Sequence, residues 1–449
     1  MRSLIIKSFQ KITCNLLNMD RFKHFDEFRA NDKLPKAQLL EIQQQRLKSL
    51  LTHAEKTVPY YKEVFSRNNV NLSTSDIYKE LTKIPITDKS ILFNRFEDFI
   101  STDFREKPYR IAYTGGSTGN PTKIMNFKED EERLIGIFYR NHSWTGFYPW
   151  NRSLWIWTTD PRCKGKGIRQ KVRFLLTGIL LNRTYLHSFD ISDIQLKKWI
   201  KIIEKSNFEA LYCHAGSTRY FIEKLDKWGI KINTKLKSIY FSAGELDNRE
   251  KMEQIFQAPV YNQYGLTEIP SVAEECKNKN MHIAIDSVYL ELIPVKGMNY
   301  GEIVLTSLER YGFPLIRYKT GDIAILKEER DCDCGLGYPV LDLLPTRTFG
   351  TLINKNGDLV SPLIASKLSK ILMDDKIRQF QLVQNKKQDL VLKIVKDDQK
   401  ISELTKRKLK DLIDRELNIN ASIKYEFVAE IPRTNDGKYW IIKNQIINS

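Results

Sequence analysis

The sequence has few cysteines, no long apolar run and a shortage of acidic residues. Six cysteines scattered over 449 residues exclude the disulfide framework of a small secreted protein, so we expect a reducing, cytoplasmic location. The absence of any apolar run of about 18 residues excludes a conventional membrane-spanning helix. Neither a paired zinc-finger spacing nor an aromatic RNA-binding signature occurs, which argues against a specific nucleic-acid module.

Basic residues outnumber acidic ones by 72 to 55, giving a formal net charge of +17. Such an excess favours anionic partners, among them nucleotides and acidic lipids. A solvated, lysine-rich surface is the plainer interpretation. Residues 2–18 predict an amphipathic surface helix, and peripheral membrane contact through the basic surface is the alternative.

The chain is too long for one simple core, so we expect an α/β protein of two domains. Residues 36–70 have helical periodicity, and strands alternate with helices from about 109 to 265, as in a parallel sheet flanked by helices. Short strands between 287 and 330 indicate a small barrel-like β region. We predict a large domain over 1–346, with 1–35 as a helical extension, and a small mobile α+β domain over 347–449.

A glycine-rich stretch, YTGGSTGNPTK, occupies residues 113–123. It is not a P-loop, because Asn120 and Pro121 follow Gly119 where that motif needs Lys and Ser or Thr. Apolar segments on both sides predict a strand–loop–strand rather than a strand–loop–helix. Backbone N–H groups and the hydroxyls of Thr114, Ser117 and Thr118 would then bind phosphate, with a long surface turn as the alternative.

Three apolar segments, 208–217, 236–245 and 259–268, each end in small and polar residues. Helical segments separate them, so they predict neighbouring parallel strands whose carboxyl ends meet at one crevice. The residues expected there are His214, Gly244, Glu245, Tyr264, Gly265, Thr267 and Glu268. Thr267 and Glu268 offer oxygen ligands suited to Mg²⁺ on a triphosphate.

Five motifs in order, YTGGSTGNPTK, YFSAGE, YNQYGLTE, RYKTGD and PRTNDGK, resemble those of the adenylate-forming enzymes over residues 35–445. The chain is most similar to the phenylacetate–CoA ligase branch and its relatives, capsular polysaccharide biosynthesis proteins and coenzyme F390 synthetases. The resemblance implies that ATP activates a carboxylic acid as an acyl-adenylate, and that coenzyme A, an amine or a carrier protein then accepts the acyl group.

The resemblance also implies residue roles. The loop Thr114, Gly115, Gly116, Ser117, Thr118 and Gly119, followed by Lys123, would hold the β- and γ-phosphates. Gly244 and Glu245 would line the adenine pocket, which Tyr264 and Gly265 would complete. Glu268, beside Thr267, would bind Mg²⁺, Asp322 the ribose hydroxyls, and Lys438 would bridge carboxylate and phosphate during adenylation.

One stretch departs from the family pattern. The hinge motif Gly-Arg-x-x-Asp is replaced by TRTFG at residues 346–350. Arg347 is retained for ribose or phosphate, whereas Thr346 and Gly350 stand where the family has glycine and aspartate. The change puts the second half-reaction in doubt, and a catalytically inactive nucleotide-binding or scaffold protein is the alternative.

A second group of residues predicts a metal centre. Cys276, His282, Cys332 and Cys334 form a Cys₃His set, which is a tetrahedral zinc complement with no open position. We therefore expect a structural zinc, with unligated thiols as the alternative.

The acid substrate is the least determined part of the prediction. Tyr139, Trp144, His214 and Tyr240 are the candidates for its pocket. The acid, the acceptor and the oligomeric state stay open at this point.

Overall fold

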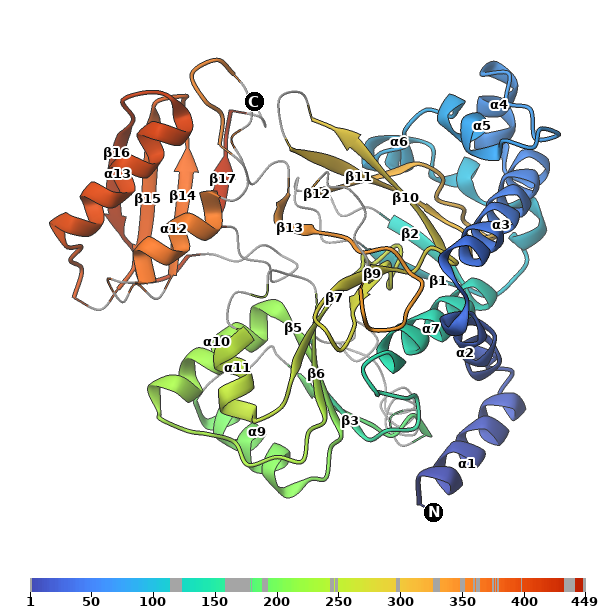
Figure 1. Cartoon of the computed structure of the whole chain (residues 1–449), viewed down its shortest axis with the longest axis horizontal. Coiled ribbons are helices and arrows are strands. Elements are labelled where there is room, and N and C mark those ends of the chain that lie inside the picture. Colours follow the sequence, from blue (N-terminus) through green and yellow to red (C-terminus); the bar gives the residue numbers. More distant parts are fainter. Residues whose placement is uncertain are drawn as a thin grey trace. The chain divides into compact units, whose positions relative to one another are not determined.

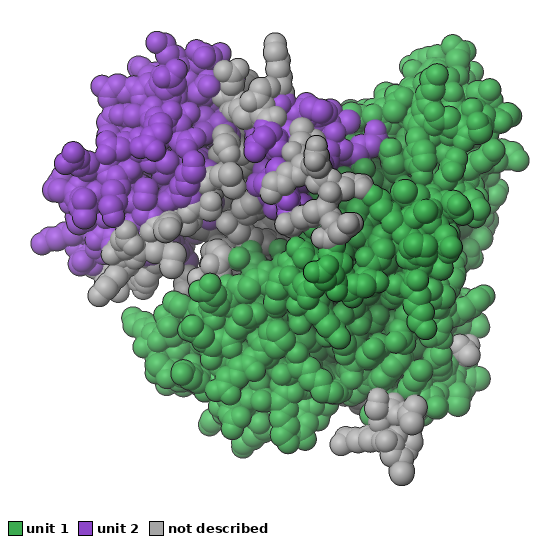
Figure 2. Space-filling view, viewed as in Figure 1, with its two compact units in different colours: residues 1–290, 304–319, 328–341 green, residues 291–303, 320–327, 342–449 purple. Residues whose placement is uncertain are grey.

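The structure is a computed structural model of the chain. It describes residues 2–113, 123–157, 180–187, 193–242, 249–295, 299–325, 332–347, 352–357, 364–373, 379–396, 398–431 and 441–446, with a few single residues between them. The chain forms two compact units (Figure 2): residues 1–290, 304–319 and 328–341 make unit 1, and residues 291–303, 320–327 and 342–449 make unit 2. The expected domain boundary at residue 346 remains a prediction.

The N-terminal part of unit 1 is helical (Figure 1), with α1 (Arg2–Leu16), α2 (Arg21–Ala30), η1 (Asn31–Lys33), α3 (Lys36–Thr57), α4 (Pro59–Arg67), α5 (Ile77–Lys83), α6 (Lys89–Asn94), η2 (Phe96–Phe99) and η3 (Thr102–Phe104). Among the described residues, none of the helices has both the length and the apolar character needed to cross a membrane.

The helical segment expected over 36–70 is interrupted at Val58. This residue is extended, with φ −110° and ψ 111°, because the ring of Pro59 disfavours a helical conformation in the residue before it. Pro59 then starts α4, where its missing N–H costs nothing. Along α3 the buried stripe includes a polar side chain, Gln43, whose Nε2 donates to the Val288 carbonyl at 2.9 Å.

A seven-stranded sheet of order β4-β3-β5-β6-β7-β8-β9 is the centre of unit 1. Its strands are β3 (Ser153–Trp157), β4 (Arg183–His187), β5 (Ala210–His214), β6 (Ser238–Ser242), β7 (Val260–Tyr264), β8 (Ala273–Glu275) and β9 (Met281–Ile283). Strands β3 to β7 are parallel to one another, whereas β8 pairs antiparallel with β7 and with β9. The parallel sheet predicted from the three strand ends is therefore confirmed.

The two faces of this sheet carry different side chains, because neighbouring residues of a strand point to opposite sides. Aliphatic residues such as Leu154 and Ile239 pack in one buried cluster with α9 (Asp193–Lys205), α10 (Ala215–Lys227) and α11 (Arg249–Phe256). The other face is aromatic, with Trp155, Tyr212 and Tyr240 packed against Phe138 of α7 (Lys128–Ser143). The second face supplies part of the site described below.

The glycine-rich stretch is flanked by an antiparallel pair, β1 (Tyr109–Tyr113) and β2 (Lys123–Phe127), with Tyr113 opposite Lys123. The predicted strand–loop–strand is thus confirmed in its two strands. The loop itself, residues 114–122, lies outside the described residues.

A four-stranded sheet follows in the order β10-β11-β12-β13, in agreement with the expected small β region. Its strands are β10 (Val288–Pro294), β11 (Tyr300–Ser307), β12 (Tyr318–Ile325) and β13 (Leu343–Arg347). In unit 2, Tyr300, Ile323 and Leu344 form a small buried cluster between them.

The C-terminal part of unit 2 is the α+β arrangement expected from the sequence. Its sheet has the order β16-β15-β14-β17 and packs with two helices around one apolar core. The elements are α12 (Ile364–Met373), β14 (Gln379–Gln384), β15 (Asp389–Val395), α13 (Glu403–Leu417), β16 (Ser422–Phe427) and β17 (Ile442–Asn444).

Candidate active site and metal centre

A tight turn follows the carboxyl end of β7. A Cβ on Gly265 would come within 2.1 Å of the Pro270 carbonyl oxygen, so only glycine fits without a backbone shift. The Leu266 N–H donates to the Ile269 carbonyl at 2.8 Å and closes the turn. The turn holds Thr267 and Glu268 beyond the edge of the sheet, where ligands of such sheets bind.

The carboxylate of Glu268 is 2% exposed and held from one side. Tyr318 Oη donates to Glu268 Oε1 at 2.8 Å. A carboxylate offers about four lone-pair sites. This is its one side-chain hydrogen bond from the residues that the structure describes, which leaves acceptor capacity for a cation. The residue type and its fixed orientation fit the predicted Mg²⁺ ligand, which stays a prediction.

Arg310 joins this turn to the hairpin and was not expected from the sequence. Its buried guanidinium donates to the Glu268 carbonyl at 2.9 Å, to Asn126 Oδ1 at 2.9 Å and to the Met125 carbonyl at 2.7 Å. β2 and the Glu268 turn are therefore held together by one cation.

A cavity of about 190 Å³ lies beside the turn within unit 1. Its lining residues are Arg21, Arg110, Asn126, Glu131, Leu134, Ile135, Phe138, Trp155, Arg183, Thr267 and Pro270. Of the predicted site residues that the structure describes, only Thr267 is in this set. The apolar members come from α7 and from the aromatic face of the sheet.

Three of the predicted acid-pocket residues, Tyr139, Trp144 and Tyr240, are not among the described residues that line this cavity. Tyr139 and Tyr240 are buried: the Tyr139 hydroxyl accepts from Arg183, and Tyr240 packs in the aromatic cluster beside Thr145. Trp144 Nε1 donates to Asp32 Oδ1 at 3.0 Å. His214 ends β5, and its side chain lies outside the description. Phe138, one helical position before Tyr139, lines the cavity instead.

The predicted nucleotide-binding residues are only partly described. Thr114, Gly115, Gly116, Ser117, Thr118, Gly119, Gly244, Glu245, Gly350 and Lys438 lie outside the described residues. Tyr264 is buried at the end of β7. Lys123 places its ammonium 4.1 Å from the centre of the Phe96 ring. In unit 2, Asp322 of β12 is paired with Arg347 of β13, so the backbone brings these two predicted ribose ligands side by side.

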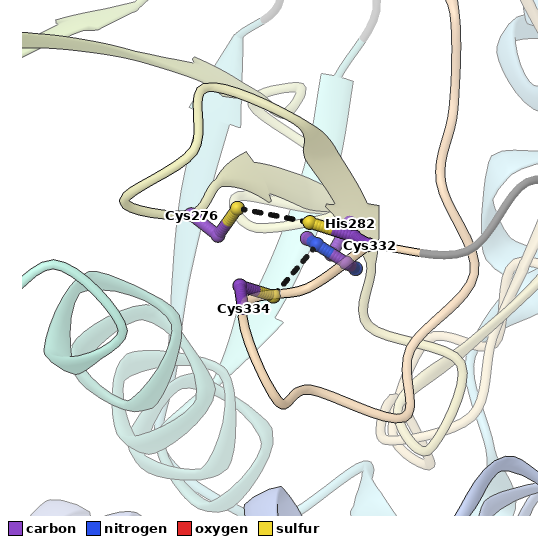
Figure 3. A group of neighbouring side chains, drawn as sticks. All are labelled: Cys276, His282, Cys332 and Cys334. Atoms are coloured by element: carbon purple, nitrogen blue, oxygen red, sulfur yellow. Dashed lines mark hydrogen bonds between the residues drawn. The ribbon is translucent and has the colours of Figure 1, made fainter.

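The four predicted metal ligands converge in unit 1 (Figure 3). Cys276 follows β8 and His282 lies in β9, whereas Cys332 and Cys334 lie on the segment before β13. One ligand atom from each lies within 4.8 Å of all the others. Cys276 Sγ is 3.7 Å from Cys332 Sγ, and Cys334 Sγ is 3.3 Å from His282 Nε2.

These distances suit a tetrahedral zinc ion. With Zn–S bonds of about 2.3 Å and tetrahedral angles, two sulfurs stand about 3.8 Å apart, and a sulfur and a nitrogen about 3.5 Å. His282 Nδ1 donates to the Tyr338 carbonyl at 2.6 Å, which leaves Nε2 as the ligand atom. Asn280 Nδ2 lies 3.2 Å from Cys332 Sγ. Burial opposes ionisation of Cys332, but the hydrogen bonds from Asn280 and His282 outweigh it and lower the pKa of the thiol.

Residues 352–445 match the family model of the CapK C-terminal domain. This is the sheet-and-helix arrangement that ends unit 2.

Two curated relatives match longer parts of the chain. Protein CapK of Staphylococcus aureus is 25% identical over 420 residues, covering 91% of this chain and 90% of that protein. Phenylacetate–coenzyme A ligase of Thermus thermophilus is 23% identical over 335 residues, covering 72% of this chain and 73% of that protein.

Among solved structures, a 2-hydroxyisobutyryl-CoA ligase in complex with 2-HIB-AMP has the same fold. Its TM-score is 0.72 at 16% identity, covering 93% of this chain and 92% of that one. An anthranilate CoA ligase in complex with anthranoyl-AMP gives 0.52 at 15% identity, covering 73% and 64%.

Proposed function

Because the chain belongs to the adenylate-forming superfamily, in the branch of the phenylacetate–CoA ligases and CapK, we propose that it activates a carboxylic acid with ATP. The chain is an acid–CoA ligase-like enzyme. Coenzyme A is the acceptor we favour. The observation that carries the proposal is the Gly265–Pro270 turn, which holds a buried carboxylate, Glu268, next to a cavity that Thr267 lines.

The proposed reaction has two steps. A carboxylate oxygen of the acid attacks the α-phosphorus of ATP, the bond to the β-phosphate oxygen breaks, and pyrophosphate leaves. The thiolate of coenzyme A then attacks the acyl carbon, AMP leaves, and the thiol proton passes to solvent. Adenylation is needed because a free carboxylate is a poor electrophile, and the protein must neutralise the charge that develops on phosphate.

The residue roles follow the resemblance. We assign the loop 114–119 and Lys123 to the phosphates, and Gly244, Glu245 and Tyr264 to the adenine. Asp322 and Arg347 are assigned to the ribose. Glu268 would hold Mg²⁺, which offsets phosphate charge when bound, and Lys438 would bridge the acid and the α-phosphate.

Pyrophosphate release from ATP and Mg²⁺ across a panel of carboxylic acids tests the proposal. We expect one class of acids to trigger release, and Lys438→Ala and Glu268→Gln to abolish it while ATP still binds. Release by both variants at the wild-type rate would contradict their roles. ATP binding without release, for every acid of the panel and for cell extract as the acid source, would favour the inactive alternative.

The acceptor and the pathway are finer parts of the proposal. An amine on a surface polysaccharide would fit the similarity to CapK, and a carrier protein is a further alternative. Single-turnover transfer from a preformed acyl-adenylate to coenzyme A or to an amino sugar distinguishes them. Failure with every acceptor would indicate that the Thr346 and Gly350 departures impair the second step.

We also propose that Cys276, His282, Cys332 and Cys334 hold one structural zinc. The geometry in Figure 3 supports this assignment, and four protein ligands would leave no position for substrate. Elemental analysis should give about one zinc per chain and little in Cys334→Ser. The control is Cys14→Ser, a buried thiol outside the group. Stable, metal-free wild-type protein would refute the site.

A peripheral membrane contact through α1 is a further part of the proposal, for a protein that we otherwise place in the cytoplasm. Phe9, Ile12 and Leu16 are 60%, 61% and 79% exposed, and their spacing places them on one stripe, while the side with Gln10 and Cys14 is buried. A basic chain with an exposed apolar stripe suits an anionic lipid surface. Co-sedimentation with phosphatidylglycerol but not phosphatidylcholine vesicles, lost in Ile12→Asp/Leu16→Asp, is expected. Equal recovery in the supernatant for wild type and variant would refute the contact.

A further inference from the structure

The cavity is not purely apolar, because the cationic side chain of Arg183 contributes to its wall. Arg183 is the first residue of β4. Its guanidinium lies 4.3 Å from the centre of the Trp155 ring, and it donates to the hydroxyls of Tyr139 and, at 3.5 Å, Tyr185. No carboxylate pairs with it among the residues that the structure describes.

The other two arginines of the cavity are neutralised. Arg21 Nε donates to Glu132 Oε2 at 2.8 Å, and its Nη2 binds the other oxygen. Arg110 Nη2 donates to Glu131 Oε1 at 2.5 Å. Among the described residues, these three cations and two carboxylates leave one positive charge, at Arg183. A guanidinium has five N–H donors, and two phenol oxygens do not satisfy them all.

Arg183 lies at the opposite end of the strands from Thr267. Backbone pairing places it opposite Ser153, Ser153 opposite Ala210, and Ala210 opposite Ser238. Arg183 is therefore level with the amino end of β7, whereas the turn with Thr267 follows its carboxyl end. Five residues of strand separate the two levels, about 16 Å along the backbone at 3.3 Å per residue.

The reacting carboxylate belongs at the Thr267 end, because the proposed nucleotide and Mg²⁺ ligands lie there. The lining also includes the apolar residues Leu134, Phe138, Trp155 and Pro270. An unpaired guanidinium stacked on an aromatic ring and backed by phenols is suited to bind a planar carboxylate through two parallel N–H donors.

We propose that the acid substrate is a dicarboxylic acid, with an apolar or aromatic body and a second carboxylate bound by Arg183. This inference rests on the proposed function and specifies its substrate class. One carboxylate is adenylated near Thr267, and the other stays ionised on Arg183. Apolar monocarboxylic acids are disfavoured, because they would cover the guanidinium without supplying an anion to pair with it.

Calorimetric binding of diacids and their monoamides tests the inference without relying on catalysis. The probes are succinate, glutarate, adipate and terephthalate, each beside its monoamide, which keeps shape but loses one charge. At least one diacid should bind roughly 10- to 100-fold more tightly than its monoamide, the range expected for a charge-assisted hydrogen bond. Arg183→Met should remove this preference for the diacid, and Arg183→Lys should retain only part of it.

Arg152→Met is the matched control and should leave diacid binding unchanged. Arg152 packs over Phe208, which belongs to the cluster on the other face of the sheet. Equal binding of diacids and monoamides, no binding of any diacid, or a preference that survives Arg183→Met would overturn the inference. Pyrophosphate release is measured in parallel: release with monocarboxylic acids alone would overturn the inference but keep the proposed function. Arg183-dependent diacid binding without release would keep the inference and count against adenylation.

Discussion

Arg140 is the centre of a buried ion network in unit 1, and its replacement by methionine gives a sharp prediction. Both Arg140 and Asp286 have side chains that are 0% exposed. The guanidinium donates to the two Asp286 oxygens at 2.7 and 2.9 Å and to Asp32 at 3.2 Å. Methionine fills a similar volume, so the substitution removes the charge and its hydrogen bonds while leaving most of the packing.

The cost follows from what remains around Asp286. Breaking a buried pair by removing one partner typically costs about 3–5 kcal/mol, because the other charge is left buried. Here Asn31 Nδ2 still donates to Asp286 at 2.8 Å and the Tyr338 hydroxyl at 3.2 Å. We therefore expect the lower end, a loss of about 3 kcal/mol in the free energy of unfolding.

The loss should depend on pH. Burial alone would raise the pKa of Asp286, and the charge of Arg140 outweighs it and lowers that pKa. Without Arg140 burial dominates, so the native carboxyl binds a proton at a pH where the unfolded one does not. Stability of the variant then falls as pH rises, and the deficit relative to wild type should be larger at pH 8 than at pH 5.5.

Urea unfolding followed by tryptophan fluorescence at both pH values measures the effect. Adding Asp286→Asn to Arg140→Met should recover part of the loss, because the uncompensated charge is then gone. Arg67→Met is the control. Because the Arg67 side chain is 73% exposed, this variant should unfold like wild type. A deficit below about 1 kcal/mol, or one that is equal at both pH values, would refute the buried-charge argument.

Three further predictions concern the candidate active site. Gly265→Ala should lose about 1–3 kcal/mol of stability and most pyrophosphate release, because its Cβ would meet the Pro270 carbonyl; a fully active, stable variant would show that the turn adapts. Tyr318→Phe removes the hydrogen bond to Glu268 and should raise the Mg²⁺ concentration needed for half-maximal release, with the far-UV spectrum unchanged; an unaltered Mg²⁺ dependence would count against Glu268 as the metal ligand. Asp322→Ala should weaken ATP binding about tenfold or more, as expected for losing a charge-assisted hydrogen bond, and wild-type affinity would show that the ribose assignment is wrong.

The parts of the fold that local sequence determines were predicted best. The strands of the Tyr109–Phe127 hairpin and the parallel strands ending at His214, Ser242 and Tyr264 follow from apolar segments bounded by small and polar residues. The break at Val58 was missed, although Pro59 gives a signal for it. The burial of the Gln43 side chain could not be predicted from the sequence, because its hydrogen-bond acceptor, the Val288 carbonyl, is 245 positions away.

The site was predictable where residue type alone limits the options. Cysteine and histidine are rare in this chain, so four of them flanking one β region could be grouped as a metal centre. The cavity beside the Glu268 turn could not be predicted, because its wall combines Phe138 of a helix with Trp155 and Arg183 of two strands. Predicting Phe138 rather than Tyr139 needs the rotation of α7 about its axis, which depends on tertiary packing. The role of Arg310 could not be predicted from the sequence, because its acceptors on Asn126 and Glu268 are distant in the sequence and come together only in the folded chain.

The four predicted metal ligands also bring together two segments that are far apart in the sequence. Cys276 and Cys332 are 56 positions apart, and between them the chain leaves unit 1 for unit 2 and returns twice. A zinc ion bound there would fasten the two ends of this excursion, which carries β10, β11 and β12 with Asp322. By analogy with a disulfide, closing a loop of that length lowers the entropy of the unfolded chain. This loss raises the free energy of unfolding by about 4 kcal/mol at 25 °C. The proposed zinc would therefore stabilise the folded segment that carries Asp322, the proposed ribose ligand, without any contact between the ion and ATP.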